Sequence, residues 1–121
     1  MMDQGGVGEM ERLAQRRAER AALLLEEAER LVQGLIALGA RRVYQFGSLT
    51  RRPPDLFTDV DVLAVMESDE PFVQRLPRIY MVLRPKVAAD ILVYTPREFE
   101  EMRERPFLRH ALKTAVLRYA A

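Results

Sequence analysis

Apolar residues recur at three- and four-residue spacing along the first third of the chain, which is typical of an amphipathic helix. We predict one long helix over residues 9–38, after a disordered tail over residues 1–8 that contains three glycines. The first half of this helix turns mainly Ala14, Ala18 and Ala21 inward, so it either extends into solvent or contacts a partner helix. The second half should pack on a core through a broad apolar stripe, made of Leu24, Leu25, Ala28, Leu31, Val32, Leu35 and Leu38.

Four later segments have the short apolar or alternating patterns of strands, at residues 42–46, 59–66, 87–94 and 115–119. The second and third of them are apolar on both faces except at a few aspartates. Strands with two apolar faces are typical of a sheet covered by helices on both sides. We therefore expect the strand over residues 59–66 in the interior of the sheet.

Helices are predicted between these strands, at residues 68–84, after Thr95, and at residues 106–113. Pro77 lies inside the first of them, so that helix is either kinked there or begins there. The second starts with a capping box, in which Thr95 caps the helix, Pro96 is its first residue and Glu98 reaches back.

The resulting order of elements predicts an α/β or α+β fold, with a mixed sheet flanked by helices and a long N-terminal helix. A length of 121 residues fits one domain, over residues 9–121, whose core we place at residues 42–119. The segment over residues 49–58 carries Pro53 and Pro54, and we interpret it as a loop with room for one helical turn.

Composition restricts the chemistry. A formal net charge of +1 gives no support for direct nucleic-acid binding. The chain has no cysteine and a single histidine, which excludes thiolate and histidine-rich metal centres, so a bound metal should be an oxygen-ligated ion such as Mg²⁺ or Mn²⁺. No secretory signal and no stretch of about 18 apolar residues is visible, so we expect a cytoplasmic protein without membrane contact.

Three carboxylates interrupt the apolar strands. Asp59 and Asp61 are two residues apart, so they face the same side, about 7 Å apart along the strand. Asp90 is isolated in the next predicted strand, where we expect it to be buried, at a cost of several kcal/mol unless it is paired. If the two strands are neighbours, the three acids converge and match a site for two metal ions about 4 Å apart, as in phosphoryl transfer.

Gly47-Ser48 follows the first predicted strand directly. Glycine allows close approach of a phosphate, and amide groups with a hydroxyl after a strand end can bind an anion. Gly-Ser alone is a common turn, and a lone Asp-x-Asp is also a weak signal. The combination is specific because it fixes residue type, spacing and structural context together.

With these residues the chain resembles the minimal nucleotidyltransferases of the DNA polymerase β-like superfamily. Their signature is Gly-Ser, ten residues, Asp-x-Asp, and a later Asp in an apolar strand, here Gly47-Ser48, Asp59, Asp61 and Asp90. The resemblance implies transfer of AMP from Mg-ATP to an acceptor hydroxyl. It implies that Asp59 and Asp61 bind two Mg²⁺ ions, or Mn²⁺, and that Asp90 binds the catalytic ion and helps to deprotonate the acceptor.

The resemblance also assigns the triphosphate to Gly47 and Ser48. Arg51 and Arg52 are further candidates for phosphate contacts, with a solvated loop as the alternative. In this family the partner is commonly a helical HEPN protein, which implies an antitoxin that attaches AMP to a partner tyrosine. Two alternatives stay open, namely an inactive antitoxin that masks its partner, and an enzyme that modifies a small molecule such as an aminoglycoside. A homo-oligomer is also possible through the first helix.

Overall fold

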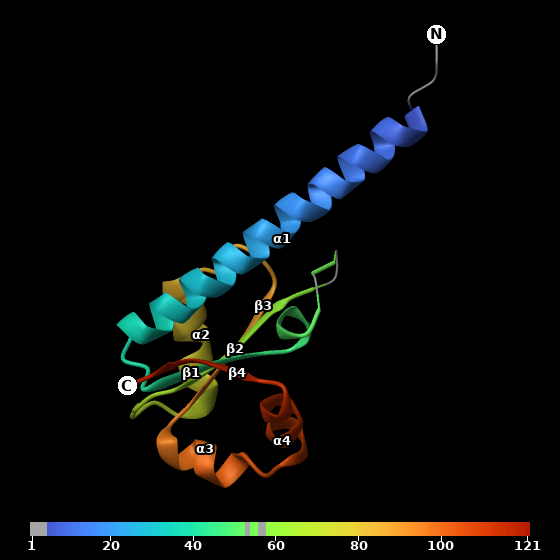
Figure 1. Ribbon diagram of the computed structural model, residues 1–121. Helices are drawn as coiled ribbons and strands as arrows, with labels where there is room; N and C mark the ends of the chain where they lie inside the picture. The colour runs from blue at the N-terminus through green and yellow to red at the C-terminus, as the bar shows by residue number, and fades with distance from the viewer. Residues whose placement is uncertain (1–4, 53, 56–57) are drawn as a thin grey trace.

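The structure is a computed structural model that describes residues 5–52, 54–55 and 58–121 (Figure 1). Its elements follow one another in nearly the predicted order: α1 (Gly5–Ala37), β1 (Arg42–Phe46), the 3₁₀ helix η1 (Ser48–Thr50), β2 (Val60–Val65), α2 (Phe72–Leu83), β3 (Ala89–Tyr94), α3 (Pro96–Met102), α4 (Pro106–Lys113) and β4 (Val116–Ala120). The loop prediction for residues 49–58 is confirmed for its described part, with one turn as η1, while Pro53, Leu56 and Phe57 lie outside the described residues.

The four strands form one sheet in the order β3-β2-β1-β4. β2 and β3 are parallel, and β1 is antiparallel to both β2 and β4, so the sheet is mixed as predicted. One apolar core lies between the sheet and helices α1 and α2, and a second lies between the sheet and helices α3 and α4 (Figure 1). The predicted α+β fold, with helices on both faces of the sheet, is confirmed.

α1 covers the sheet with its second half and projects beyond it with its first half (Figure 1). Leu24, Ala28, Leu31, Val32 and Leu35 are buried as predicted, whereas Leu25 is 56% exposed because neighbouring Leu24 takes the inward position. The helix begins at Gly5, so residues 5–8 are helical, which corrects that part of the predicted disordered tail. Residues 1–4 of the predicted tail lie outside the described residues. Extension of a formed helix adds one hydrogen bond per residue, which outweighs the weak propensity of these glycines.

A polar pair on α1 fixes the end of α2. Arg30 donates from Nη1 to the carbonyl of Leu83 at 2.8 Å and from Nη2 to that of Arg84 at 3.0 Å. Buried Glu27 binds Arg30 and accepts from the amide of Lys86, and the bond to Arg30 is the main reason that the pKa of Glu27 is lowered. Because the last carbonyls of a helix need partners, this pair sets where α2 ends and where the chain enters β3.

The predicted capping box of α3 is present. The Thr95 side chain accepts from the amide of Glu98 at 3.2 Å, and the Glu98 carboxylate accepts from the amide of Thr95 at 2.8 Å. The helix does not begin at Pro77, since α2 begins at Phe72 and contains the proline in its interior.

The outer edge of β3 is closed by side chains of α2. The backbone carbonyls of Ala88 and Tyr94 face β2, where they accept from the amides of Val60 and Met66. The backbone amides and carbonyls of residues 89, 91 and 93 therefore face outward, away from β2. Tyr80 donates its hydroxyl to the carbonyl of Ala89 and accepts from the amide of Ile91, both at 2.8 Å. An open sheet edge is a liability that proteins cover or charge, and here one helix covers it.

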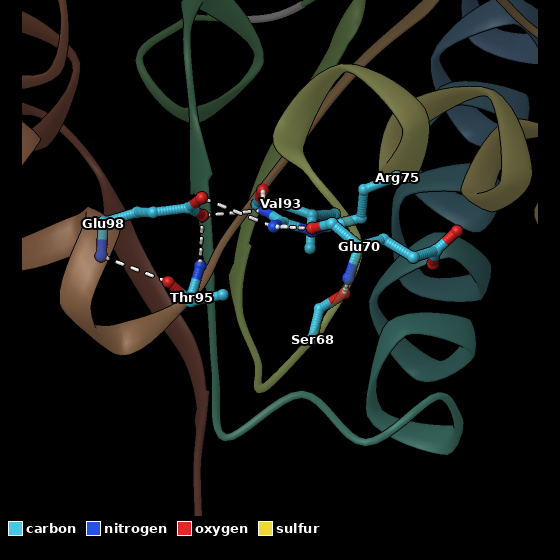
Figure 2. A network of polar contacts seen from close by, with 6 residues as sticks. All are labelled: Ser68, Glu70, Arg75, Val93, Thr95 and Glu98. Carbon is cyan, nitrogen blue, oxygen red and sulfur yellow. Dashed lines mark hydrogen bonds and ion pairs between the residues drawn. The ribbon is translucent and has the colours of Figure 1, made fainter.

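Arg75 completes this closure further along the strand (Figure 2). Its side chain is 1% exposed and donates from Nη1 to the carbonyl of Val93 at 2.8 Å and to Glu98 at 2.7 Å. Nη2 donates to the carbonyl of Glu70 at 2.6 Å, whereas Nε has no partner among the described residues. The guanidinium therefore joins α2, β3 and the start of α3.

No helix in the described part of the chain combines the length and apolar character needed to cross a membrane.

Candidate active site

Asp61 and Asp90 lie directly opposite each other in the register of the parallel strands β2 and β3. The condition under which the acids were expected to converge, that these two strands are neighbours, is therefore met. The two side chains share a sheet face with Leu63 and Leu92, which contact the core under α3 and α4. Asp59 lies just before β2 and is exposed. The loop that leads to it is held by Thr58, a buried residue.

Asp90 corrects one expectation, because it is exposed rather than buried. Leu92 and Tyr94 follow it on the same face of β3 and are covered by the helices, but Asp90 lies closer to the start of the strand, beyond that cover. An apolar strand therefore does not imply that each of its positions is buried. The acid needs no partner to offset burial, and it is accessible to a ligand.

The carboxylates repel one another at this end of the sheet, where β2 and β3 begin. The pKa of Asp61 is raised to about 7, first by burial, then by its hydrogen bond to Asp90, and then by the negative charges of Asp90 and Asp59. Near neutral pH a bound proton therefore neutralises one of these carboxylates. A hard divalent cation would offset the same repulsion through the same oxygen atoms, so the donor set fits Mg²⁺ or Mn²⁺.

As the side chains lie, no three acidic or histidine residues in the described ranges are close enough together to hold a metal ion. Asp61 and Asp90 form the centre of the candidate site, and Asp59 would have to turn toward them to join it. The three predicted ligands are thus brought to the end of the sheet where β2 and β3 begin, with two of them in contact.

Gly47 packs directly on Asp61. Its φ of 79° is in the left-handed region, which favours glycine. A Cβ atom at this position would overlap the Asp61 carboxylate and would lie 2.9 Å from its Cγ. Ser48 then begins η1, and its carbonyl accepts from the amides of Arg51 and Arg52, both at 3.1 Å. The Gly-Ser turn and the Asp-x-Asp motif, ten residues apart in sequence, therefore form one surface.

Replacing Gly47 with alanine should lower the free energy of unfolding by about 3 kcal/mol, because backbone strain is added to a steric clash with Asp61. Gly39→Ala is a matched control, since Gly39 also has a positive φ, of 106°, but no atom lies within 4 Å of the position that its Cβ would take. The control should lose only about 1–2 kcal/mol from strain. Urea unfolding of both variants measures the difference, and equal losses would show that Asp61 does not contact Gly47.

A cleft of about 490 Å³ opens beside the two paired carboxylates. Its other walls are mainly apolar and come from β1, α2, β3 and α4: Phe46, Leu76, Tyr80, Ile91, Leu92 and Phe107. Among these residues Phe107 is 61% exposed. No spacing in the sequence marks these residues, because the fold alone brings them beside the acids.

Arg51 and Arg52 are exposed in the loop after η1. Neither side chain forms a hydrogen bond or ion pair with another residue that the structure describes. Both alternatives for them, a phosphate contact or a solvated loop, therefore remain predictions.

Comparison with known proteins adds one finding. The fold is similar to a crystal structure of a "putative nucleotidyltransferase" from Sulfolobus solfataricus, with a TM-score of 0.59, 20% sequence identity and coverage of 86% of each chain. The chain has a nucleotidyltransferase-like fold. No protein-family model matches it, and no curated protein matches it in sequence. At this identity the likeness concerns the fold, so the activity has to be argued from the site.

Proposed function

We propose that the protein is a metal-dependent nucleotidyltransferase that transfers AMP from ATP to a hydroxyl of a partner protein. The observation that carries the proposal is the direct opposition of Asp61 and Asp90 on parallel strands, with Gly47 packed on the Asp61 carboxylate. A structural site would pair these acids with arginine or lysine, and the described residues offer them no such partner. The nucleotidyltransferase-like fold supports the same proposal.

In this proposal Asp59 and Asp61 hold two Mg²⁺ ions, for which Mn²⁺ can substitute, and Asp90 joins them at the catalytic ion. Bound divalent ions supply charge stabilisation to a transferring phosphoryl group. Gly47 and Ser48 approach the triphosphate through backbone amides and the serine hydroxyl, and Arg51 and Arg52 steady its outer oxygens.

The reaction follows from these positions. The acceptor oxygen attacks the α-phosphorus of ATP, a new P–O ester bond forms, and the bond from the α-phosphorus to the bridging oxygen breaks. Pyrophosphate leaves with that bridging oxygen. The proton of the acceptor hydroxyl passes to Asp90, which is exposed and can release it to water.

The shape of the site favours an acceptor supplied by a second protein. The cleft ends at Asp61 and Asp90 but has mainly apolar walls, including the exposed Phe107. These walls suit an apolar or aromatic side chain that carries a hydroxyl, rather than a polycation. We therefore propose a HEPN-type helical partner modified on a tyrosine, with this protein as its antitoxin. The projecting half of α1 is a candidate contact for that partner or for a second copy of the chain.

Incubation with labelled ATP, Mg²⁺ and the co-purifying partner tests the function. We expect label on the partner, loss of labelling in EDTA, and recovery when Mg²⁺ or Mn²⁺ is added in excess, since like-charged acids need the cation to bind a triphosphate. Mass spectrometry of the product should show one or more AMP groups on a hydroxyl. Absence of label, or labelling that persists in EDTA, would contradict the proposal.

One further assay separates catalysis from masking. If the protein only covers its partner, the double variant Asp59→Ala plus Asp61→Ala should still neutralise the partner's activity. If it acts by nucleotidyl transfer, that variant should fail to neutralise while it remains folded.

A further inference from the structure

The start of β3 is held from both sides. Toward the sheet, the carbonyl of Ala88 accepts from Val60, and Asp90 lies opposite Asp61. On the outer side, the hydroxyl of Tyr80 forms hydrogen bonds with the two backbone groups that flank Asp90. Tyr80 donates to the carbonyl of Ala89 and accepts from the amide of Ile91, each at 2.8 Å.

We propose that Tyr80 is a positioning residue for Asp90, and that its hydroxyl fixes the carboxylate opposite Asp61. The inference rests on the proposed function, in which Asp90 binds the catalytic ion and receives the acceptor proton. Groups that orient metal ligands contribute strongly to affinity and activity, and their loss typically costs about 10- to 100-fold.

The tyrosine is itself well anchored. Its ring packs against the core under α1 and α2, so the hydroxyl is held by a side chain with little freedom. It also lines the cleft that contains Asp61 and Asp90. Without the hydroxyl, the outward amide of Ile91 and carbonyl of Ala89 would have to bind water, because no other described strand lies along this edge. The segment around Asp90 would then be held less firmly on its outer side.

Arg75 shows what a purely structural role at the same edge looks like. It binds the carbonyl of Val93, three residues beyond Asp90, and it is not among the residues that line the cleft. Tyr80 differs because its two bonds enclose a proposed catalytic residue. The two side chains close one strand edge, but only the tyrosine acts at the site.

The test compares Tyr80→Phe with Tyr44→Phe in the full chain. Both variants keep the ring and lose a hydroxyl, and the Tyr44 hydroxyl accepts from Arg42 at 3.2 Å on the other side of the sheet. Amide hydrogen exchange at Ile91, Mn²⁺ affinity of the protein without nucleotide, and kcat and KM for ATP are measured well below the unfolding midpoint. If Tyr80 acted in folding alone, the variant would shift the unfolding midpoint but would leave the Mn²⁺ affinity and the kinetic constants unchanged.

For Tyr80→Phe we expect faster exchange at Ile91, Mn²⁺ affinity reduced about tenfold, and kcat reduced about 10- to 100-fold with KM for ATP changed less than about twofold. Tyr44→Phe should match the wild type in all of these. Unchanged Ile91 exchange, or unchanged Mn²⁺ affinity and kcat, would overturn the positioning role. A wild-type protein that binds Mn²⁺ but transfers no AMP would instead overturn the proposed function, and the Mn²⁺ affinities would still decide the role of Tyr80.

Discussion

Replacing Asp61 with asparagine should reduce nucleotidyl transfer by at least about 10²- to 10³-fold and also stabilise the metal-free protein at neutral pH. The loss follows because Asp61 is opposite Asp90 and contacts the Gly-Ser turn, so no other described side chain can take its place. The gain follows because the neutral amide removes a charge that burial and two nearby acids disfavour. A substitution that lowers activity but raises stability indicates that repulsion between charged groups at the site destabilises the fold.

The stability effect depends on pH in a defined direction. The pKa of Asp61 is about 7 in the folded protein, whereas its ordinary value is 3.8. Between these values the folded state binds a proton that the unfolded state does not, so the free energy of unfolding falls as pH rises from about 4 to about 7. Above pH 7 this contribution is constant. After discounting for solvent screening we expect a change of roughly 2 kcal/mol.

Urea unfolding in EDTA at pH 5 and pH 8 measures this change. Wild type should lose stability from the lower to the higher pH, and Asp61→Asn should lose less. Asp69→Asn is the control, since Asp69 is an exposed acid in the turn before α2. If Asp61→Asn shows the full wild-type slope, Asp61 is not the group that titrates.

Local signals in the sequence explain why most of the fold is predictable. β1 and α4 have the predicted bounds, because a turn or a proline limits each of them. Thr95 and Glu98 form the predicted capping box, since both partners lie within one helical turn. The apolar faces of β2 indicated an interior strand, and β2 pairs with β1 on one side and with β3 on the other.

The remainder depends on contacts between distant segments. Asp90 was expected to be buried because its neighbours are apolar, but its exposure depends on how far α3 and α4 extend over the sheet. The helical pattern of α2 indicates only that large side chains can occupy the positions of Arg75 and Tyr80. Their bonds to the edge of β3 arise because α2 packs beside that strand, which no periodicity in the sequence encodes.

Arg75→Met should give the largest loss of stability among these substitutions, about 3–5 kcal/mol. Methionine has a similar length, so little volume is lost, but the carbonyls of Val93 and Glu70 lose the guanidinium as donor. The carboxylate of Glu98 loses its charged partner and keeps the amide of Thr95. The bond to Arg75 is the main reason that the pKa of Glu98 is lowered, which indicates that the carboxylate is charged and depends on this partner.

Arg78→Met is the matched control on the same helix. Arg78 also pairs with an acid, Glu70 at 2.6 Å, but the two side chains are 47% and 36% exposed, so its loss should cost less than about 1 kcal/mol. Adding Glu98→Gln to Arg75→Met should recover part of the loss, because the unpaired charge is removed, and the double-mutant cycle gives the coupling energy. If Arg75→Met costs no more than Arg78→Met in urea unfolding, α2 is held against β3 by its apolar contacts, and the buried guanidinium is not what closes the edge of the sheet.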